Sequence, residues 1–151
     1  MKAFTIVEIL ISIAVVGVLV AIVMAGLSSF RESTNLTRAR DIVFQTLKNA
    51  RIQTLASDSA SSFGVRFAST SITLFMGNGY NPSDASNKEA ILPVLAEISS
   101  VGFEGTTSAE IYFRRLTGEP SNTGTITLRS ARNEDKILMI EIFSSGLITA
   151  P

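Results

Sequence analysis

One ionisable side chain stands where a long apolar helix is expected to begin, and that side chain is Glu8. The next charged residue is Arg31, so the run Ile9–Phe30 carries no charge. As a helix this run would rise about 33 Å, enough to cross a bilayer hydrocarbon core of roughly 30 Å. A carboxylate at the entrance of such a helix costs free energy unless it is paired. A group that pairs with Glu8 is therefore needed before this helix can enter an apolar environment without that cost.

The composition excludes most catalytic chemistry. The chain has no cysteine and no histidine, which removes disulfides, thiolate metal sites and the commonest general base and metal ligand. Serine–lysine or paired-carboxylate catalysis would remain, but no spacing of residues supports either. We expect a protein that is not an enzyme, with no catalytic residue, no metal and no cofactor.

Local patterns allow two interpretations of the apolar run. A secretory signal peptide would have a shorter apolar core and a small-residue cleavage site, and this run instead continues into a helical pattern. In a simple membrane anchor, Lys2 would favour a cytoplasmic N-terminus. Thr5 and Glu8 would then form a capping box, with Thr5 at the N-cap and Glu8 at the third helical position. This interpretation gives Glu8 a local partner.

A third interpretation comes from the segment Ala3–Leu10, which reads AFTIVEIL. It resembles the class III signal of type IV pilins and type II secretion pseudopilins. The resemblance implies that a prepilin peptidase cuts between Ala3 and Phe4, that the new N-terminus is methylated, and that residues 1–3 are a leader. The chain departs from the family pattern in having Ala3 where glycine is usual. It also has Ala25 where major subunits often carry a helix-breaking proline.

The resemblance also implies how subunits would assemble. Glu8 of one subunit would meet the amine of Phe4 on a neighbour, which sets an axial stagger of one subunit. Residues 4–30 would lie first in the lipid bilayer and then among the helices of other subunits. Small residues recur along this helix at three- and four-residue spacing: Ala14, Gly17, Ala21 and Ala25. They permit close helix approach, although small residues are also ordinary in a membrane helix.

The region 31–151 suits one small domain with its own core. Apolar residues recur at helical spacing in its first part: Leu36, Ala39, Val43, Leu47 and Ala50. Together with the apolar run they predict one long helix from Thr5 to Ala56. Its second half, about 31–56, is amphipathic and is expected to cover a sheet.

After a serine-rich stretch the apolar period changes to two, which is typical of strands. Strands are expected at 63–67, 72–76, 91–95, 98–103, 109–114, 125–129, 136–143 and 147–149. One helix followed by consecutive strands predicts an α+β fold with an antiparallel sheet, which is the pilin fold if the resemblance holds. The patterns at 125–128, 137–142 and 146–148 also resemble the GspH/FimT-type minor pseudopilins.

Two ligand hypotheses arise in the soluble region. The resemblance raises DNA binding, because some FimT-like minor pilins take part in DNA uptake, and arginines that could contact DNA stand at Arg114, Arg115, Arg129 and Arg132. Residues 110–151 hold five basic and five acidic groups, so the electrostatic footprint of a DNA-binding surface is lacking. Acidic and amide residues stand at Asn81, Asp84, Asn87 and Glu89. They match no calcium-loop spacing, and a solvated loop is favoured.

The expected function is that of a minor pseudopilin-like structural subunit. Its partners would be other pilin subunits, the prepilin peptidase, an inner-membrane assembly platform and, before assembly, lipid. It would cross the inner membrane once, with its N-terminus in the cytoplasm and its C-terminal domain outside, and then enter a periplasmic or extracellular filament. The alternatives are a DNA-binding minor pilin and a major pilin subunit. The sequence leaves open secretion, pilus and DNA-uptake systems.

Overall fold

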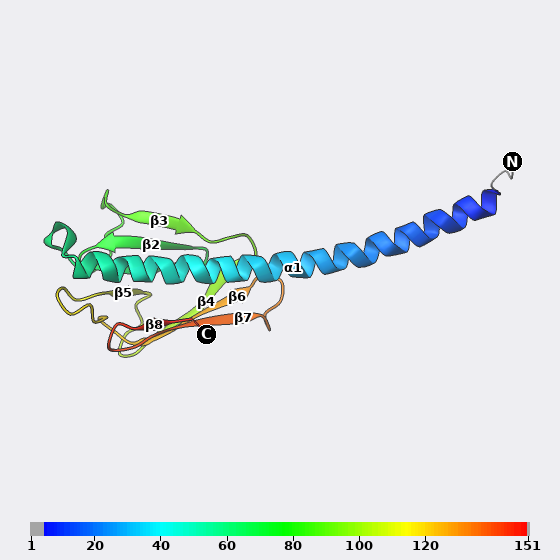
Figure 1. The fold of residues 1–151 in the computed structure, drawn as a ribbon. Helices are drawn as coiled ribbons and strands as arrows, with labels where there is room; N and C mark the ends of the chain where they lie inside the picture. The colour runs from blue at the N-terminus through cyan, green and yellow to red at the C-terminus, as the bar shows by residue number, and fades with distance from the viewer. Residues whose placement is uncertain (1–4, 151) are drawn as a thin grey trace. The chain divides into compact units, whose positions relative to one another are not determined.

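The computed structural model describes the backbone of residues 5–150, and the side chains in that range except those of Ala25, Ser28 and Asp58. One α-helix, α1 (Ile6–Leu55), is followed by a short 3-10 helix, η1 (Asp58–Ala60), and then by β-strands (Figure 1). The chain divides into two compact units, the first extending to Thr34 and the second beginning at Asn35. Each unit is described separately below.

The first unit consists of the N-terminal part of α1. Its large apolar side chains are exposed along the whole run from Ile6 to Phe30, on every side of the helix. The helix is long and apolar enough to cross a membrane. The described residues of this unit therefore contain no core, and within residues 5–150 its large apolar side chains are left exposed.

The second unit begins with the C-terminal part of α1, which has a buried stripe. The stripe consists of Leu36, Ala39, Val43, Leu47, Ala50 and Thr54. The predicted helix, Thr5 to Ala56, differs from the observed helix by one residue at each end. The turn after α1 contains non-glycine residues with positive φ, Ser57 and Ser59 among them, a backbone conformation that a helix cannot continue.

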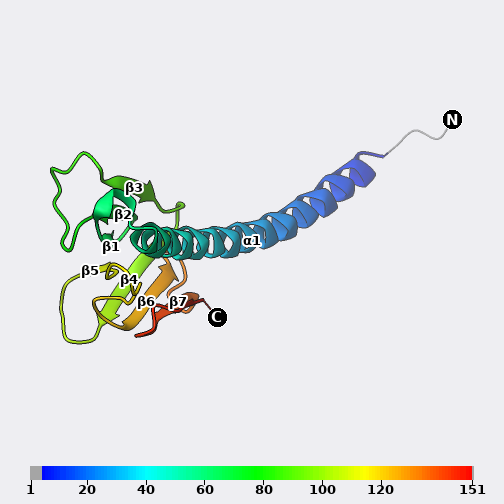
Figure 2. The ribbon, with the colours of Figure 1, turned by 60° about the vertical axis from the view of Figure 1, so that its left-hand side comes forward.

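The strands form two four-stranded antiparallel sheets. The first has the order β3-β2-β1-β5, with β1 (Phe63–Phe67), β2 (Ser71–Met76), β3 (Lys88–Ile91) and β5 (Glu110–Tyr112). The second has the order β4-β6-β7-β8, with β4 (Ala96–Phe103), β6 (Gly124–Ser130), β7 (Ile137–Ile142) and β8 (Ile148–Thr149). In Figures 1 and 2 the C-terminal half of α1 lies between β2–β3 on one side and β6–β7 on the other.

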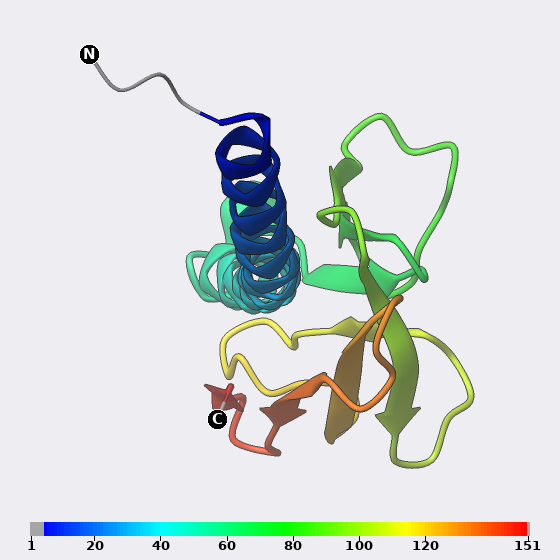
Figure 3. The same ribbon diagram turned by 90° about the vertical axis from the view of Figure 1, so that its right-hand side faces the viewer.

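The structure confirms the α+β class but corrects the prediction of one sheet and of a strand at 91–95. Strand β3 begins at Lys88 and ends at Ile91. After it Leu92 turns into the core, Pro93 cannot donate to a ladder, and Leu95 has φ 71°. The chain thereby leaves the first sheet, and β4 pairs with β6 instead. In Figure 3 the green strands β2 and β3 lie apart from the orange strands β6 and β7, beside which the yellow-green β4 runs.

One core joins the two sheets and the helix. The rings of Phe67 from the first sheet and Phe103 from the second lie 5.9 Å apart between centroids. The backbone N–H of Ile98 donates to the carbonyl of Ser69 at 2.8 Å, across the junction of the sheets. The stripe of α1 belongs to the same buried cluster. The C-terminal half of the helix is thus part of the core of the second unit.

Candidate functional site

The start of α1 places Thr5 and Glu8 as the sequence predicts for a helix cap. The backbone N–H of Glu8 donates to the hydroxyl of Thr5 at 3.3 Å and lies 3.1 Å from its carbonyl oxygen. This is one half of a capping box, because Thr5 satisfies an N–H that the helix leaves unpaired. Within residues 5–150, the carboxylate of Glu8 has no hydrogen-bond or ion-pair partner. A carboxylate in the first turn also complements the helix dipole.

The predicted cleavage and methylation residues, Ala3 and Phe4, lie outside the described residues. The predicted pairing of Glu8 with the amine of Phe4 involves a second subunit and is likewise not described. The structure therefore presents one member of the predicted site, Glu8, as an exposed carboxylate.

The predicted packing residues Ala14, Gly17 and Ala21 lie on one exposed stripe of α1. At 100° per residue, they fall within a sector of about 60° around the helix axis. A Cβ atom added at Gly17 would have nothing within 4 Å. The stripe is therefore open in the single chain, and it offers a surface on which another helix could approach closely.

The polar residue Ser12 is accommodated inside the apolar run by a bond within the helix. Its hydroxyl donates to the carbonyl of Glu8 at 2.7 Å. A hydroxyl that bonds to the carbonyl four residues earlier needs no partner from outside the helix. Ser12 therefore does not prevent this part of α1 from entering an apolar environment.

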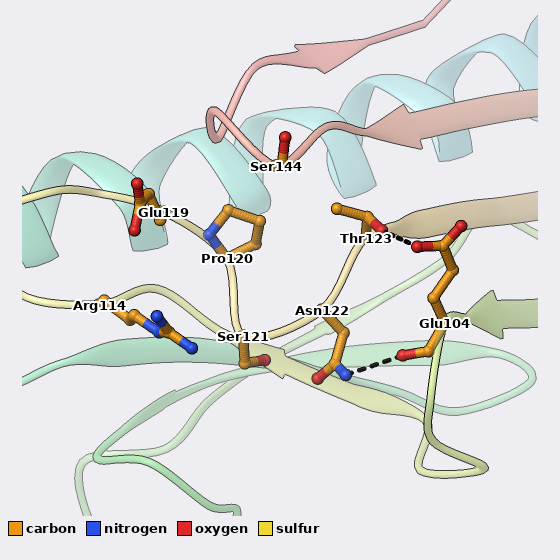
Figure 4. A pocket seen from close by; sticks show the side chains of 8 residues that line it. All are labelled: Glu104, Arg114, Glu119, Pro120, Ser121, Asn122, Thr123 and Ser144. Carbon is orange, nitrogen blue, oxygen red and sulfur yellow. Dashed lines mark hydrogen bonds between the residues drawn. The ribbon is translucent and has the colours of Figure 1, made fainter.

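The second unit carries a polar hollow of about 400 Å³, shown in Figure 4. It is lined by Glu104, Arg114, Glu119, Pro120, Ser121, Asn122, Thr123 and Ser144. The carboxylate of Glu104 accepts a 2.6 Å hydrogen bond from the hydroxyl of Thr123, and Asn122 donates to the carbonyl of Glu104 at 2.9 Å. These bonds join the end of β4 to the segment that leads into β6.

Two of the four arginines considered for DNA binding, Arg129 and Arg114, have carboxylates near them. Arg129 donates to Glu97 at 2.6 Å and to Glu134 at 3.5 Å. The hydrogen bond to Glu97 and its charge raise the pKa of Arg129 above its ordinary value. Arg114 lines the same hollow as Glu104 and Glu119. These neighbours offset the positive charge that a phosphate backbone would need.

The loop considered for calcium is closed by its own hydrogen bonds. Asn81 accepts from the N–H of Ser83 at 3.0 Å, and Asp84 accepts from the N–H of Ser86 at 2.8 Å. The backbone and side-chain hydrogen bonds of Ser86 hold the pKa of Asp84 below its ordinary value. Among residues 5–150, no three acidic side chains gather as metal ligands would. Asp84 and Glu89 thus belong to a self-bonded loop and a strand.

Sequence reasoning missed a residue that joins three segments of the second unit. Arg51, on α1, donates to the carbonyl of Gly118 at 3.1 Å and to that of Ser145 at 3.3 Å. Gly146 has φ +76°, and a Cβ atom there would overlap the carbonyl oxygen of Gly118. The only signal in the sequence is a pair of glycines in separate loops, which does not identify their partner.

Comparison with known proteins adds no relative. No family model matches the chain, and neither a curated protein nor a solved structure matches it. What is established is an α+β fold whose single long helix has an apolar N-terminal part able to span a membrane.

Proposed function

We propose that this chain is a type IV pilin-like structural subunit of the minor pseudopilin type, anchored in the membrane and then built into a filament through its N-terminal helix. The observation that supports this most directly is Glu8, an exposed carboxylate without a partner among residues 5–150, at the start of a helix that could span a bilayer. A residue in this position would be costly in an anchor that simply stayed in lipid.

The exposed apolar surface of α1 supports two successive environments. Before assembly, lipid would cover the run from Ile9 to Phe30. After assembly, the same run would pack against the helices of other subunits, and the open stripe at Gly17 would allow close approach. In this proposal the soluble domain, held to α1 by the buried stripe, stays on the outer side of the membrane.

Cleavage before Phe4 would supply the partner that Glu8 lacks. The new ammonium group of one subunit would lie against the Glu8 carboxylate of its neighbour, and the pair would offset much of the cost of burying either charge. Only one axial register brings these charges together while covering the apolar run. Glu8 would then determine the stagger between subunits, and the capping bond from its N–H to Thr5 would persist.

Mass spectrometry of the mature N-terminus tests the proposal. The full chain would be produced together with a prepilin peptidase and recovered from membranes. The expected N-terminal residue is N-methylated Phe4. An intact Met1, or a cut beyond residue 20, would contradict the proposal.

Substitution of Glu8 separates the assembly role from the capping role. Glutamine at the third helical position still supports a capping box, but it carries no charge. We expect Glu8→Gln to enter the membrane normally and to lose incorporation into filaments, measured in the sheared filament fraction. Thr5→Val is the matched control, because it removes the hydroxyl that accepts from Glu8 and leaves the charge. Normal incorporation of Glu8→Gln would leave Glu8 as a cap only.

A further inference from the structure

The connection between β3 and β4 carries apolar side chains that the fold of the second unit leaves exposed. Among the described residues of that unit, the most exposed large apolar side chains are Ile91 at 76%, Val94 at 78% and Leu116 at 81%. Ile91 and Val94 belong to one uncharged segment, Ala90–Ala96, whereas Leu116 follows Arg115. Single exposed apolar residues are ordinary on a protein surface, but a group of them in an uncharged segment indicates a contact surface.

Backbone hydrogen bonds hold this connection in place and satisfy polar groups that would otherwise need water. The N–H of Leu92 donates to the carbonyl of Thr70 at 2.9 Å. The carbonyl of Leu95 accepts from the N–H of Ala131, also at 2.9 Å. Pro93 has no N–H to satisfy. Because unpaired polar groups are what makes leaving water costly, this connection can enter a less polar environment at a reduced cost.

The connection is bonded to α1 close to the end of its uncharged run. The side-chain amide of Asn35 donates to the carbonyl of Val94 at 3.1 Å, and Figure 1 shows the chain passing from the tip of β3 to the helix. Asn35 follows Phe30, the last residue of the run, by five positions of α1. It therefore lies no more than about 7.5 Å beyond a hydrocarbon core that ends at Phe30. A headgroup layer is roughly 5–7 Å thick on each side, so the connection would lie at the level of the headgroups.

A cation lies on the helix face that bears this connection. Arg38 follows Asn35 by three positions, which makes the two side chains neighbours on the surface of α1. Arg38 is exposed and forms no salt bridge within residues 5–150. Aliphatic side chains beside a cation are typical of surfaces that bind the headgroup layer, because the aliphatic groups reach the acyl boundary while arginine binds phosphate. The charge of this surface thus favours phospholipid as its partner.

We propose that the connection between β3 and β4 is a second membrane contact, in which Ile91 and Val94 enter the headgroup layer of the bilayer that holds α1, and Arg38 binds a lipid phosphate. The proposal rests on the membrane anchoring of α1 in the proposed function, and it does not depend on Glu8 or on filament assembly. Two points of attachment, the helix and this connection, would then hold the second unit at one tilt to the membrane surface.

Cysteine labelling tests the proposal, because the chain has no cysteine of its own. Full-length Val94→Cys would be reconstituted in vesicles of phosphatidylethanolamine and phosphatidylglycerol and treated with a membrane-impermeant maleimide. Leu116→Cys is the matched control, since Leu116 is equally exposed and nearby Gly118 lies against Leu55, about 30 Å along α1 from Asn35. The initial labelling rate should be about tenfold lower for Val94→Cys than for Leu116→Cys.

Two further substitutions show whether lipid causes this protection. Ile91→Glu replaces an exposed side chain with a charge that opposes entry into an anionic headgroup layer. In the Val94→Cys chain it should restore the labelling rate to that of Leu116→Cys. Arg38→Gln removes one cation from the membrane surface and should raise the labelling rate of Val94→Cys about fivefold. Neither change should alter thermal unfolding, because both side chains are exposed.

Equal labelling rates for Val94→Cys and Leu116→Cys in vesicles would overturn the proposal. Protection that survives Ile91→Glu would also overturn it, as would protection that increases with the ratio of protein to lipid, since another copy of the chain would then be the cover. Flotation of the vesicles separates this proposal from the proposed function. A chain that floats with the vesicles but is labelled rapidly at position 94 contradicts only the second contact, whereas a chain that does not float contradicts the anchoring of α1 as well. Glu8→Gln should leave the protection unchanged.

Discussion

The two halves of α1 have the same backbone conformation but opposite relations to the rest of the chain. From Ile6 to Phe30 every described side chain of the helix is exposed, and Leu19 is 57% exposed. From Asn35 to Leu55 one stripe is buried, and Leu47 is 0% exposed. The second half finds its cover in the two sheets of its own unit, whereas in the proposed function the first half finds it in lipid and then in other subunits. A single element would thus, in the proposed function, serve folding at one end and assembly at the other.

The largest expected effect comes from truncating a leucine in each half. Leu47→Ala should destabilise the domain formed by the second unit by about 2–5 kcal/mol, because it opens a cavity in the core. Leu19→Ala should leave the unfolding of that domain unchanged. Urea denaturation of the full chain in detergent, followed by the fluorescence of Tyr80 and Tyr112, measures both. A similar loss in the two variants would contradict the division of α1 into a folding half and an assembly half.

Adding a methyl group at one glycine in each unit tests the difference in packing between the core of the second unit and the exposed helix of the first. At Gly64 a Cβ atom would overlap the ring of Phe75 and lie 2.6 Å from the carbonyl oxygen of Ile111, so Gly64→Ala should cost about 1–3 kcal/mol. At Gly17 nothing lies within 4 Å. Gly17→Ala should therefore leave the melting temperature unchanged while reducing filament incorporation. Normal incorporation would remove Gly17 from the proposed helix interface.

Removing a hydroxyl from each half of α1 compares a buried hydroxyl that bonds to another segment with an exposed one that bonds only within the helix. Thr54 is buried, accepts from the N–H of Phe63 at 2.9 Å and donates to the carbonyl of Ala50 at 2.8 Å. Thr54→Val should cost about 1–3 kcal/mol, because it leaves the N–H of Phe63 unsatisfied. Ser12→Ala should not affect the domain. Amide hydrogen exchange at Phe63 should accelerate only in Thr54→Val, and protection at the wild-type level would refute the role of this hydroxyl.

The smallest effect is expected from replacing an arginine in each half. Arg51→Met should cost about 1 kcal/mol, because the loops at Gly118 and Ser145 lose a shared donor. Arg31→Met, at an exposed position of the first unit, should leave the domain unchanged. Hydrogen exchange in the turn between β7 and β8 reports the change. Unaltered exchange in Arg51→Met would mean that Gly118 and Gly146 hold the loops together without it.

The elements of the fold were largely predictable from the sequence, because their signals are local. Helical spacing predicted the stripe from Leu36 to Ala50, and the stripe is buried as predicted. Alternation of apolar residues located most strands, since a strand with one face in a core repeats every two residues. The prediction failed at 91–95, where Pro93 and the positive φ of Leu95 interrupt an apolar run.

The candidate site was predictable only in part. Glu8 stood out because a charge beside an apolar run is visible in one chain, and the hydrogen bond from its N–H to Thr5 was predictable from the capping pattern. The register of Glu8 with a neighbour involves a second chain and stays a proposal. Arg51 was not predictable, because its two acceptors lie 67 and 94 residues away in the sequence.

The sequence alone thus determined the long helix, its uncharged span, its amphipathic second half and the absence of histidine and cysteine chemistry. Only the tertiary structure decided that the strands divide into two sheets and that β8 pairs with the last two residues of β7. The physical reason is that periodicity records whether a face is buried. Strand order and edge coverage instead depend on which distant segments compete for the same backbone hydrogen bonds.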